Sequence, residues 1–359
     1  MEVSAQMVEA LVMGGAFLGG GGGGSTEEGL RLGRLALELG TPIILELDDM
    51  DPAAWVATVS MVGAPAAQEA FLEPMDHVRA LGKLAENLDA PLGGIICNEM
   101  GGLASVNGLL QSAVLGLPMI DAPCNGRAHP IAAMGSMGLH LMERYVSVQA
   151  ACGGNREQGR RLEMVVKGGL ENCSAMVRQA AVRAGGLVAV ARNPVQCAWL
   201  TEHCAVGAMA MAQKLGEMLL AEAAAGRKAA AVSDFLGGAV LATAKVEQKE
   251  LVTKGGFDLG SLVLASGHEL VFWNEYMLVE RRGKVPFSFP DLITTLDAAS
   301  GLPVSSAEVG LGQEVILVGA PAGSLLLGAG ARDTELWRRA EEAIGSPLGA
   351  DAAGDVNAA

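Results

Sequence analysis

The sequence is poor in positive charge and has no hydrophobic run long enough to cross a membrane. It contains 25 Lys and Arg against 40 Asp and Glu, a formal net charge of −15, which argues against nucleic acid or an anionic membrane as the main partner. A spanning helix would need roughly 18 to 20 consecutive apolar residues. The N-terminal segment carries two glutamates and no basic region, unlike a signal peptide. We therefore expect a cytoplasmic protein that binds a small molecule.

Cysteine pairs at CxxC spacing are also missing. The six cysteines lie mostly in apolar contexts, which is typical of reduced thiols in a reducing compartment. Each is expected to behave mainly as a small buried hydrophobic side chain. They are Cys97, Cys124, Cys152, Cys173, Cys197 and Cys204.

The fold expected from the hydrophobic patterns has two parts. Residues 1–155 alternate between helical and strand patterns, which predicts an α/β domain with a mostly parallel sheet. Residues 156–359 are expected to form a second domain, helical over 157–228, apart from one strand within AGGLVAVARNP, and rich in antiparallel β structure over 231–320. The Ala- and Met-rich helices of this part could face a core or a partner subunit, so a homo-oligomer stays open.

A run of six glycines precedes the pattern of a helix at about 27–39. Each glycine loses much backbone entropy on folding, so an ordered loop here needs a compensating role. Backbone amides at a helix start can surround a carboxylate or phosphate, because no Cβ blocks the approach. A mobile loop or a tight packing corner is the alternative. The residues expected to bind substrate are Gly20, Gly21, Gly22, Gly23, Gly24 and Ser25.

The segment CNEMGG places Cys97, Asn98 and Glu99 at the end of a buried strand. The carboxyl ends of parallel strands are where ligands usually bind in such sheets. Burying a carboxylate is costly unless it is paired. We therefore expect Glu99 to act as a general base or to hold a substrate N–H, unless it caps the following helix, and we expect Asn98 to contact substrate.

The segment DAPCNGRAHP is the densest cluster of reactive side chains in the sequence. It contains Asp121, Cys124, Asn125, Arg127 and His129. A thiol near an arginine and a histidine is in a setting that lowers its pKa and favours a thiolate nucleophile. The alternative is a structural loop in which the arginine pairs with the aspartate.

A zinc site is a further alternative for the same region, because thiolate and imidazole are good zinc ligands. Its ligands would be Cys97, Cys124 and His129, although their spacing matches no standard zinc pattern. We expect no cofactor and no metal in the leading interpretation.

In the segment HELVFWNEYM, Asn274 and Glu275 are adjacent in an otherwise apolar strand. Alternation along a strand would point them to opposite faces, so at most one of them should reach a given pocket.

Taken together, the segments GGGGGGS, VGAP, NEMGG, DAPCNGRAHP, KGGFDLGSLVL, VFWNEYMLVE and FPDLITTLDAASGLPV resemble the DUF917 family, whose members are linked to S-methyl thiohydantoin desulfurase and are often found beside hydantoinases. The likeness runs in order from about residue 10 to 320. Where the commoner family pattern reads Gly-Arg-Ala-Phe-Pro-Glu, this sequence reads GRAHPI, so His129 replaces an aromatic residue and Ile131 an acid.

The resemblance implies a cytoplasmic hydrolase acting on a five-membered ring like that of hydantoin, which replaces an S-methyl group by water and releases methanethiol. On this basis Cys124, with Cys97 second, is expected to be the nucleophile. His129 or Glu99 would transfer protons, and Asp121 would orient the histidine. Arg127 and the glycine-loop amides would bind a carboxylate of the substrate, and Asn125, Asn274 and Glu275 would also bind substrate.

Two alternatives belong to other functional classes. In the first, the same cysteines and histidine hold a metal ion, and the protein is a metal-dependent cyclic amide hydrolase. In the second, the protein binds a small anion without catalysis and acts as the partner of a hydantoinase-like enzyme.

Overall fold

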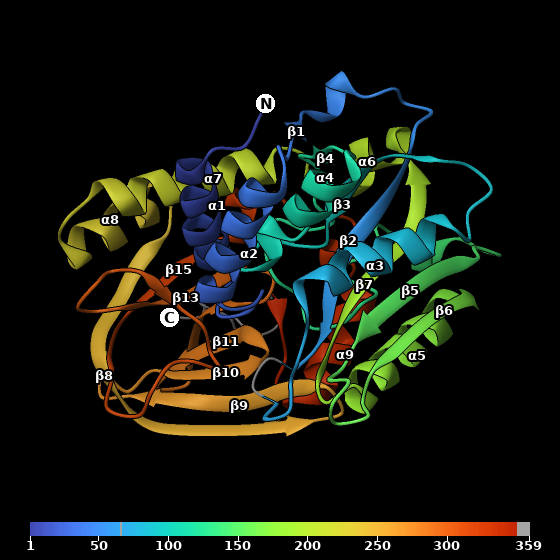
Figure 1. The fold of residues 1–359 in the computed structure, drawn as a ribbon. Coiled ribbons are helices and arrows are strands. Elements are labelled where there is room, and N and C mark those ends of the chain that lie inside the picture. The colour runs from blue at the N-terminus through green and yellow to red at the C-terminus, as the bar shows by residue number, and fades with distance from the viewer. Residues whose placement is uncertain (65–66, 350–359) are drawn as a thin grey trace.

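The computed structural model describes residues 1–64 and 67–349. These residues form two sheets with helices packed against them (Figure 1). No helix in the described ranges is long and apolar enough to span a membrane. The second domain expected from the sequence extends to residue 359, and its last segment, 350–359, lies outside the described residues.

The first sheet has seven strands in the order β1-β4-β3-β2-β7-β5-β6. Strands β1, β4, β3 and β2 are mutually parallel, whereas β7, β5 and β6 are joined by antiparallel pairs. Because β5 is antiparallel to β7, it runs in the same direction as β2, and the expected mostly parallel sheet is confirmed. The bounds are β1 Ile44–Leu45, β2 Trp55–Gly63, β3 Leu92–Cys97, β4 Met119–Ile120, β5 Ser147–Gly153, β6 Leu162–Gly168 and β7 Leu187–Gln196.

Helices cover both faces of this sheet, as strand alternation requires. In β7, Ala189 and Ala191 pack into the core formed with α1 and α3. The intervening Val188 and Val190 pack against α5 on the other face. The helices of this part are α1 Ala5–Leu18, α2 Thr26–Leu39, α3 Pro74–Ala85, α4 Leu109–Leu115 and α5 Leu170–Arg183.

The second sheet has eight strands in the order β12-β11-β10-β9-β8-β15-β13-β14, and all of its pairs are antiparallel. This confirms the expected β-rich part. The bounds are β8 Ala239–Lys254, β9 Phe257–Leu264, β10 Glu269–Trp273, β11 Glu275–Arg281, β12 Lys284–Ser288, β13 Leu292–Asp297, β14 Pro303–Val304 and β15 Glu314–Ala320. The remaining helices are α6 Cys197–His203, α7 Ala208–Ala221, α8 Ala225–Phe235 and α9 Thr334–Ile344, and short 3-10 turns occur at 47–49, 104–106, 139–141, 322–324 and 330–332.

One stretch expected to be helical is a strand. Over β6 the burial alternates residue by residue, with Glu163, Val165 and Lys167 exposed. This period of two is that of a half-buried strand, and it was hidden by the helix-favouring composition of the surrounding residues. Strands β6 and β7 belong to the first sheet although they come after residue 155. The domain boundary expected near residue 155 therefore falls between strands of one sheet.

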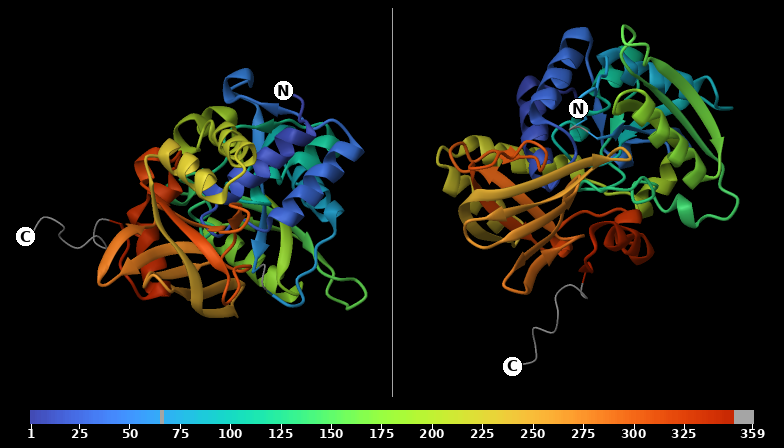
Figure 2. Two further views of the ribbon diagram at one scale, coloured as in Figure 1. Left: turned by 90° about the vertical axis from the view of Figure 1, so that its left-hand side faces the viewer. Right: turned by 90° about the horizontal axis from the view of Figure 1, so that it is seen from below.

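Helix α7 fixes α1, and thereby the start of the glycine loop. The two helices meet through small residues: a Cβ on Gly14 would overlap the carbonyl of Ala212, and a Cβ on Gly216 would overlap that of Ala10. Helix α8 packs on β8 and β15. Figure 2 shows the resulting arrangement, in which α7 and α8 (yellow) connect the helices near the N-terminus with the second sheet (orange).

Candidate active site

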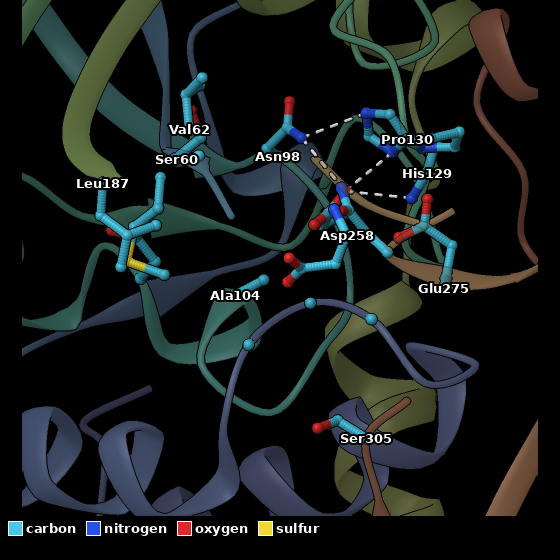
Figure 3. A pocket seen from close by; sticks show the side chains of 18 of the residues that line it. Ser60, Val62, Asn98, Ala104, His129, Pro130, Leu187, Asp258, Glu275 and Ser305 are labelled. Carbon is cyan, nitrogen blue, oxygen red and sulfur yellow. Dashed lines mark hydrogen bonds and ion pairs between the residues drawn. The ribbon is translucent and has the colours of Figure 1, made fainter. Parts of the chain in front are cut away.

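A cavity of about 310 Å³ lies where the two sheets and the glycine loop meet (Figure 3). Its wall comes from the glycine loop, the second half of β2, the loops after β3 and β4, the middle of α5, the first half of β7, the start of β9, the break between β10 and β11, and the loop after β14. The polar side chains that line it are Ser25, Ser60, Asn98, Glu99, Asn107, His129, Arg178, Arg192, Asp258, Asn274, Glu275, Ser305, Ser306 and Glu308.

The glycines are required by the backbone path and by close packing. Gly21 and Gly23 have φ values of +87° and +76°, a region that other residues rarely adopt. A Cβ on Gly21 would lie 2.7 Å from the ring of Tyr276, and one on Gly23 would overlap the backbone of Gly101. Gly20 lies beneath the cavity rather than on its wall, with its carbonyl accepting from the amide of Tyr276 at 2.7 Å.

The rest of the loop faces the cavity at the start of α2. The residues from Gly21 to Ser25 line the wall, and Ser25 precedes the helix without a side-chain capping bond. The amides of Gly23 and Gly24 form no hydrogen bond with another described residue. The loop is thus a tightly packed corner that also leaves two backbone amides without a partner among the described residues at the start of α2.

Glu99 and His129 form the central contact of the site. Oε2 of Glu99 lies 2.9 Å from Nδ1 of His129, and the same oxygen accepts from the backbone amide of His129 at 3.3 Å. The pair joins the loop after β3 to the loop after β4, which are neighbouring strands. Glu99 therefore holds the histidine, the role expected of Asp121.

A chain of hydrogen bonds fixes the orientation of this histidine. Nη2 of Arg192 donates to Oδ1 of Asn98 at 2.7 Å. The amide nitrogen of Asn98 is therefore at the end of the side chain away from Arg192, and it lies 3.2 Å from Nε2 of His129. Because the amide nitrogen of Asn98 is a donor, Nε2 of His129 accepts this hydrogen bond. The ring proton is then on Nδ1, which donates a hydrogen bond to Glu99. Arg192 was not expected from the sequence; its signal is a lone charge in the apolar strand pattern VAVARNP.

Asn125 supports the histidine from behind. Its amide nitrogen donates to the carbonyl of Met134 at 2.9 Å. The same nitrogen lies 3.3 Å from Nδ1 of His129, and with the proton on Nδ1 this is a packing contact between two donors, not a hydrogen bond. Its Oδ1 accepts from the amide of Gly328 at 2.9 Å. Asn125 is buried and does not line the cavity, so it contacts the histidine and not, as expected, the substrate.

Glu275 is a second carboxyl group in the same cavity. It is buried, and its Oε1 has no hydrogen-bond partner among the described residues. Burial and the nearby charge of Glu99 raise the pKa of Glu275 well above its ordinary value, and the charge of Arg127 only partly opposes them. The proton is therefore held more tightly on Glu275 than on an ordinary glutamate, and Glu99 and Glu275 have different environments.

Asn274 and Glu275 both line the cavity, so the expectation that at most one of them would do so is wrong. The reason is a break between β10 and β11 at Asn274, whose φ is +61°. Its side chain accepts from the amide of Asp258 at 2.9 Å. The left-handed backbone interrupts the alternation of the strand and turns Glu275 inward.

Arg127 was expected to bind a substrate carboxylate, and the structure does not support this. Its guanidinium is fully buried and does not line the cavity. It donates to the carbonyls of Asp291 and Tyr276 and packs on the ring of Phe289. Burial lowers its pKa to about 10. Arg127 therefore ties the loop after β4 to the second sheet.

The expected nucleophiles are also outside the cavity. Cys97 and Cys124 are fully buried in apolar clusters and neither lines the wall. Burial raises the pKa of Cys97 well above its ordinary value. For Cys124 burial acts in the same direction, but hydrogen bonds with Cys204 and Thr58 and the charge of Arg192 outweigh it and lower its pKa. A thiol without access to the cavity cannot attack a ring bound there.

Asp121 has a structural role in place of the expected contact with His129. Its carboxylate accepts from the amides of Met209 and Ala210 at 2.7 and 3.0 Å, which are the first turn of α7. An acceptor at a helix start satisfies amides that have no partner within the helix.

The expected zinc ligands do not come together. Among residues 1–64 and 67–349, no group of three or more His, Cys, Asp or Glu side chains is arranged so that it could hold a metal ion. His129 faces the cavity, whereas Cys97 and Cys124 face the apolar core.

Comparisons with known proteins identify the family and a related fold. Residues 6–158 match the family model described as S-Me-THD-like, N-terminal domain, and residues 170–333 match S-Me-THD-like, C-terminal domain. No curated protein matches the sequence. A crystal structure of a protein from Chromobacterium violaceum has the same fold, with a TM-score of 0.69 and 19% identity over 97% of this chain and 99% of that one. The chain therefore belongs to the S-methyl thiohydantoin desulfurase-like family.

Proposed function

We propose that the protein is a hydrolase that replaces the S-methyl group of an S-methyl thiohydantoin by water, releasing methanethiol and a hydantoin. The observation that carries the proposal is the pair of carboxyl groups in one cavity: Glu99, held by His129, and the buried Glu275 with a free oxygen. Family membership supports the substrate class.

Glu99 is the proposed general base. Its Oε2 contacts His129, while Oε1 remains available to a water molecule in the cavity. Hydrogen bonding to His129 and Asn98 orients the carboxylate. A positioned base that removes a proton from water as the oxygen attacks ring carbon C2 accelerates the reaction by typically about 10²- to 10⁴-fold.

Glu275 is the proposed general acid. A carboxyl group with a raised pKa keeps its proton to higher pH than an ordinary glutamate and can donate it to the ring nitrogen next to C2, which makes this carbon more electrophilic. The unpaired Oε1 of Glu275 would gain its missing partner when the ring binds.

The proton transfers balance as follows. Water gives one proton to Glu99 and its oxygen bonds to C2, while Glu275 protonates the ring nitrogen. The C2–S bond then breaks. The departing methanethiolate takes the proton from Glu99, and the new hydroxyl returns a proton to Glu275 as the C2 carbonyl forms. Both carboxyl groups are restored, and no covalent intermediate with Cys124 or Cys97 is needed.

The test is release of free thiol from synthetic S-methyl thiohydantoins by the purified protein, measured with a thiol reagent, with formation of the hydantoin followed by mass spectrometry. Turnover that depends on Glu99 and Glu275 supports the proposal. Turnover that disappears with a chelator and returns with zinc would support the metal-dependent cyclic amide hydrolase instead. Tight binding of hydantoins with no turnover would support a non-catalytic partner of a hydantoinase-like enzyme.

A further inference from the structure

A hydrogen-bonded histidine and aspartate lie outside the cavity. Nε2 of His140 is 2.7 Å from Oδ2 of Asp333, and the two side chains are only 9% and 13% exposed. Neither residue lines the cavity wall. His140 lies in the 3-10 turn 139–141, beyond the loop that carries His129, whereas Asp333 precedes α9. The pair therefore connects the start of α9 with the loop after β4.

Further hydrogen bonds fix both side chains. Nδ1 of His140 lies 2.8 Å from Oγ of Ser136, and this hydroxyl donates to the carbonyl of Ala133 at 2.7 Å. Because the hydroxyl proton is used there, Oγ accepts the hydrogen bond from Nδ1. Oδ1 of Asp333 accepts from the amide of Glu335 at 2.9 Å, which caps α9. Burial acts to raise the pKa of Asp333, but the hydrogen bonds from His140 and Glu335 outweigh it, so this pKa is lowered.

The segment 133–136 lies directly against two side chains of the candidate site. A Cβ on Gly135 would overlap Oδ1 of Asn98 and Nε2 of His129. These two side chains contact each other, and His129 in turn contacts Glu99. A displacement of the backbone at Gly135 therefore changes the space in which the imidazole is held.

The turn before α9 packs on the same segment. A Cβ on Gly330 would overlap the carbonyl of Met134, and Met134 shares an apolar cluster with Ala331 and Leu336. The carbonyl of Met134 also accepts from Asn125 at 2.9 Å. The segment 133–136 contains no helix or strand, so contacts with distant parts of the sequence set its position.

We propose that His140 and Asp333 are positioning residues, which hold the segment 133–136 against His129 and thereby fix the orientation of its imidazole. Apolar packing is non-directional, whereas the hydrogen bonds from Asp333 through His140 to Ser136 have defined distances and angles. They therefore set the path of this segment more sharply than the apolar cluster does. The inference deepens the proposed function and rests on it for the effect on turnover.

The test uses two substitutions of Asp333 that differ in reach. Asn and Ser are both good helix caps, so Asp333→Asn and Asp333→Ser should each keep the start of α9. Asn can still form a hydrogen bond with Nε2 of His140, whereas Ser is too short to do so. For Asp333→Ser we expect kcat per folded protein to fall about tenfold with little change in KM, and Asp333→Asn should stay within about twofold of the unmodified protein.

Nitrogen NMR of the His129 imidazole provides a second readout that needs no turnover. The unmodified protein and Asp333→Asn should show the single Nδ1–H tautomer, whereas Asp333→Ser and His140→Ala should show a mixture. His268→Ala is the matched control, because His268 is also buried and lies 2.9 Å from a serine hydroxyl, but in the turn between β9 and β10. This variant should change neither kcat nor the tautomer.

An unchanged kcat and an unchanged tautomer in Asp333→Ser and His140→Ala would overturn the inference, because apolar packing alone would then hold the segment. Equal effects of Asp333→Asn and Asp333→Ser, or a change in only one of the two readouts, would also reject it. If the unmodified protein releases no thiol, the proposed function fails and the tautomer alone decides. A mixture in Asp333→Ser but not in Asp333→Asn then still supports the positioning role, and one tautomer in both rejects it.

Discussion

Nδ1 of His129 lies 2.9 Å from Oε2 of Glu99, and this contact joins the loops that follow two neighbouring strands. The histidine is held at its other nitrogen by Asn98. Glu99 thereby keeps one fixed orientation in the cavity, with one oxygen engaged and the other available to water.

Replacing the proposed base should remove catalysis without unfolding the protein. Glu99→Gln keeps the size of the side chain and can still bond to His129, but it cannot accept a proton. We expect kcat/KM to fall by about 10²- to 10⁴-fold, with an unchanged melting temperature. Glu308→Gln, at another part of the wall, is the control. Activity retained in Glu99→Gln would show that another group activates the water.

The raised pKa of Glu275 should make the turnover rate depend on pH. As general acid it must be protonated, so kcat should fall as the pH rises through this raised pKa, and Glu275→Gln should remove that limb together with most of the turnover. A profile that stays flat to high pH in the unmodified protein would argue against the role.

Glu275 should make the protein less stable as the pH rises, whereas a carboxylate held in an ion pair makes it more stable. Its folded pKa is above the ordinary value of 4.5, so the folded state binds the proton more tightly than the unfolded state. Stability is therefore fully present below pH 4.5 and falls as the pH rises toward the folded pKa. Glu275→Gln should consequently raise the melting temperature relative to the unmodified protein at neutral pH, but not at pH 4. Equal differences at both values would contradict this assignment.

Asn98 is expected to be a positioning residue for His129. Without its amide, Nε2 of the histidine loses its donor, and the ring is free to turn or change tautomer. We expect Asn98→Ala to lower kcat by about tenfold or more, with a smaller change in KM. Nitrogen NMR of the imidazole should show the Nδ1–H tautomer in the unmodified protein and a mixture in the variant. A single unchanged tautomer would mean that Glu99 alone sets the orientation.

Cys124 should be dispensable for turnover, because its thiol lies outside the cavity. Cys124→Ser is expected to keep kcat/KM and to lose some stability, since it buries a hydroxyl in an apolar cluster. Cys197→Ser is a comparable change in the same cluster. Rapid labelling of Cys124 by iodoacetamide near neutral pH, with loss of turnover, would restore the thiolate mechanism.

The glycine loop offers a test of its packing role. Gly23→Ala places a methyl group at positive φ and against the backbone of Gly101, and should lower the free energy of unfolding by about 2–5 kcal/mol. Gly82→Ala, where an added Cβ has nothing within 4 Å in helix α3, should instead be stabilising by about 0.5–1 kcal/mol. Denaturant unfolding of both variants decides between an ordered and a mobile loop.

Local patterns in the sequence determined most of the elements, though not β6, and they determined the family. Alternation in the C-terminal half predicted the antiparallel sheet, and ordered segments from GGGGGGS to GLPV predicted the family that the comparisons identify. Glu99 and His129, which the structure brings together in the cavity, lie in the loops that follow β3 and β4, strands whose carboxyl ends meet at one edge of the sheet.

Tertiary packing decided what each polar residue does. Charge and proximity in the sequence suggested Cys124 and Arg127 for chemistry, yet both point into the interior, where one contacts Thr58 and the other backbone carbonyls. Arg178 and Arg192 lie far from these residues in the sequence and reach the cavity from α5 and β7. Spacing along a sequence defines which face of a strand or helix a side chain occupies, but the register between distant strands and the turn at Asn274 define which side chains meet.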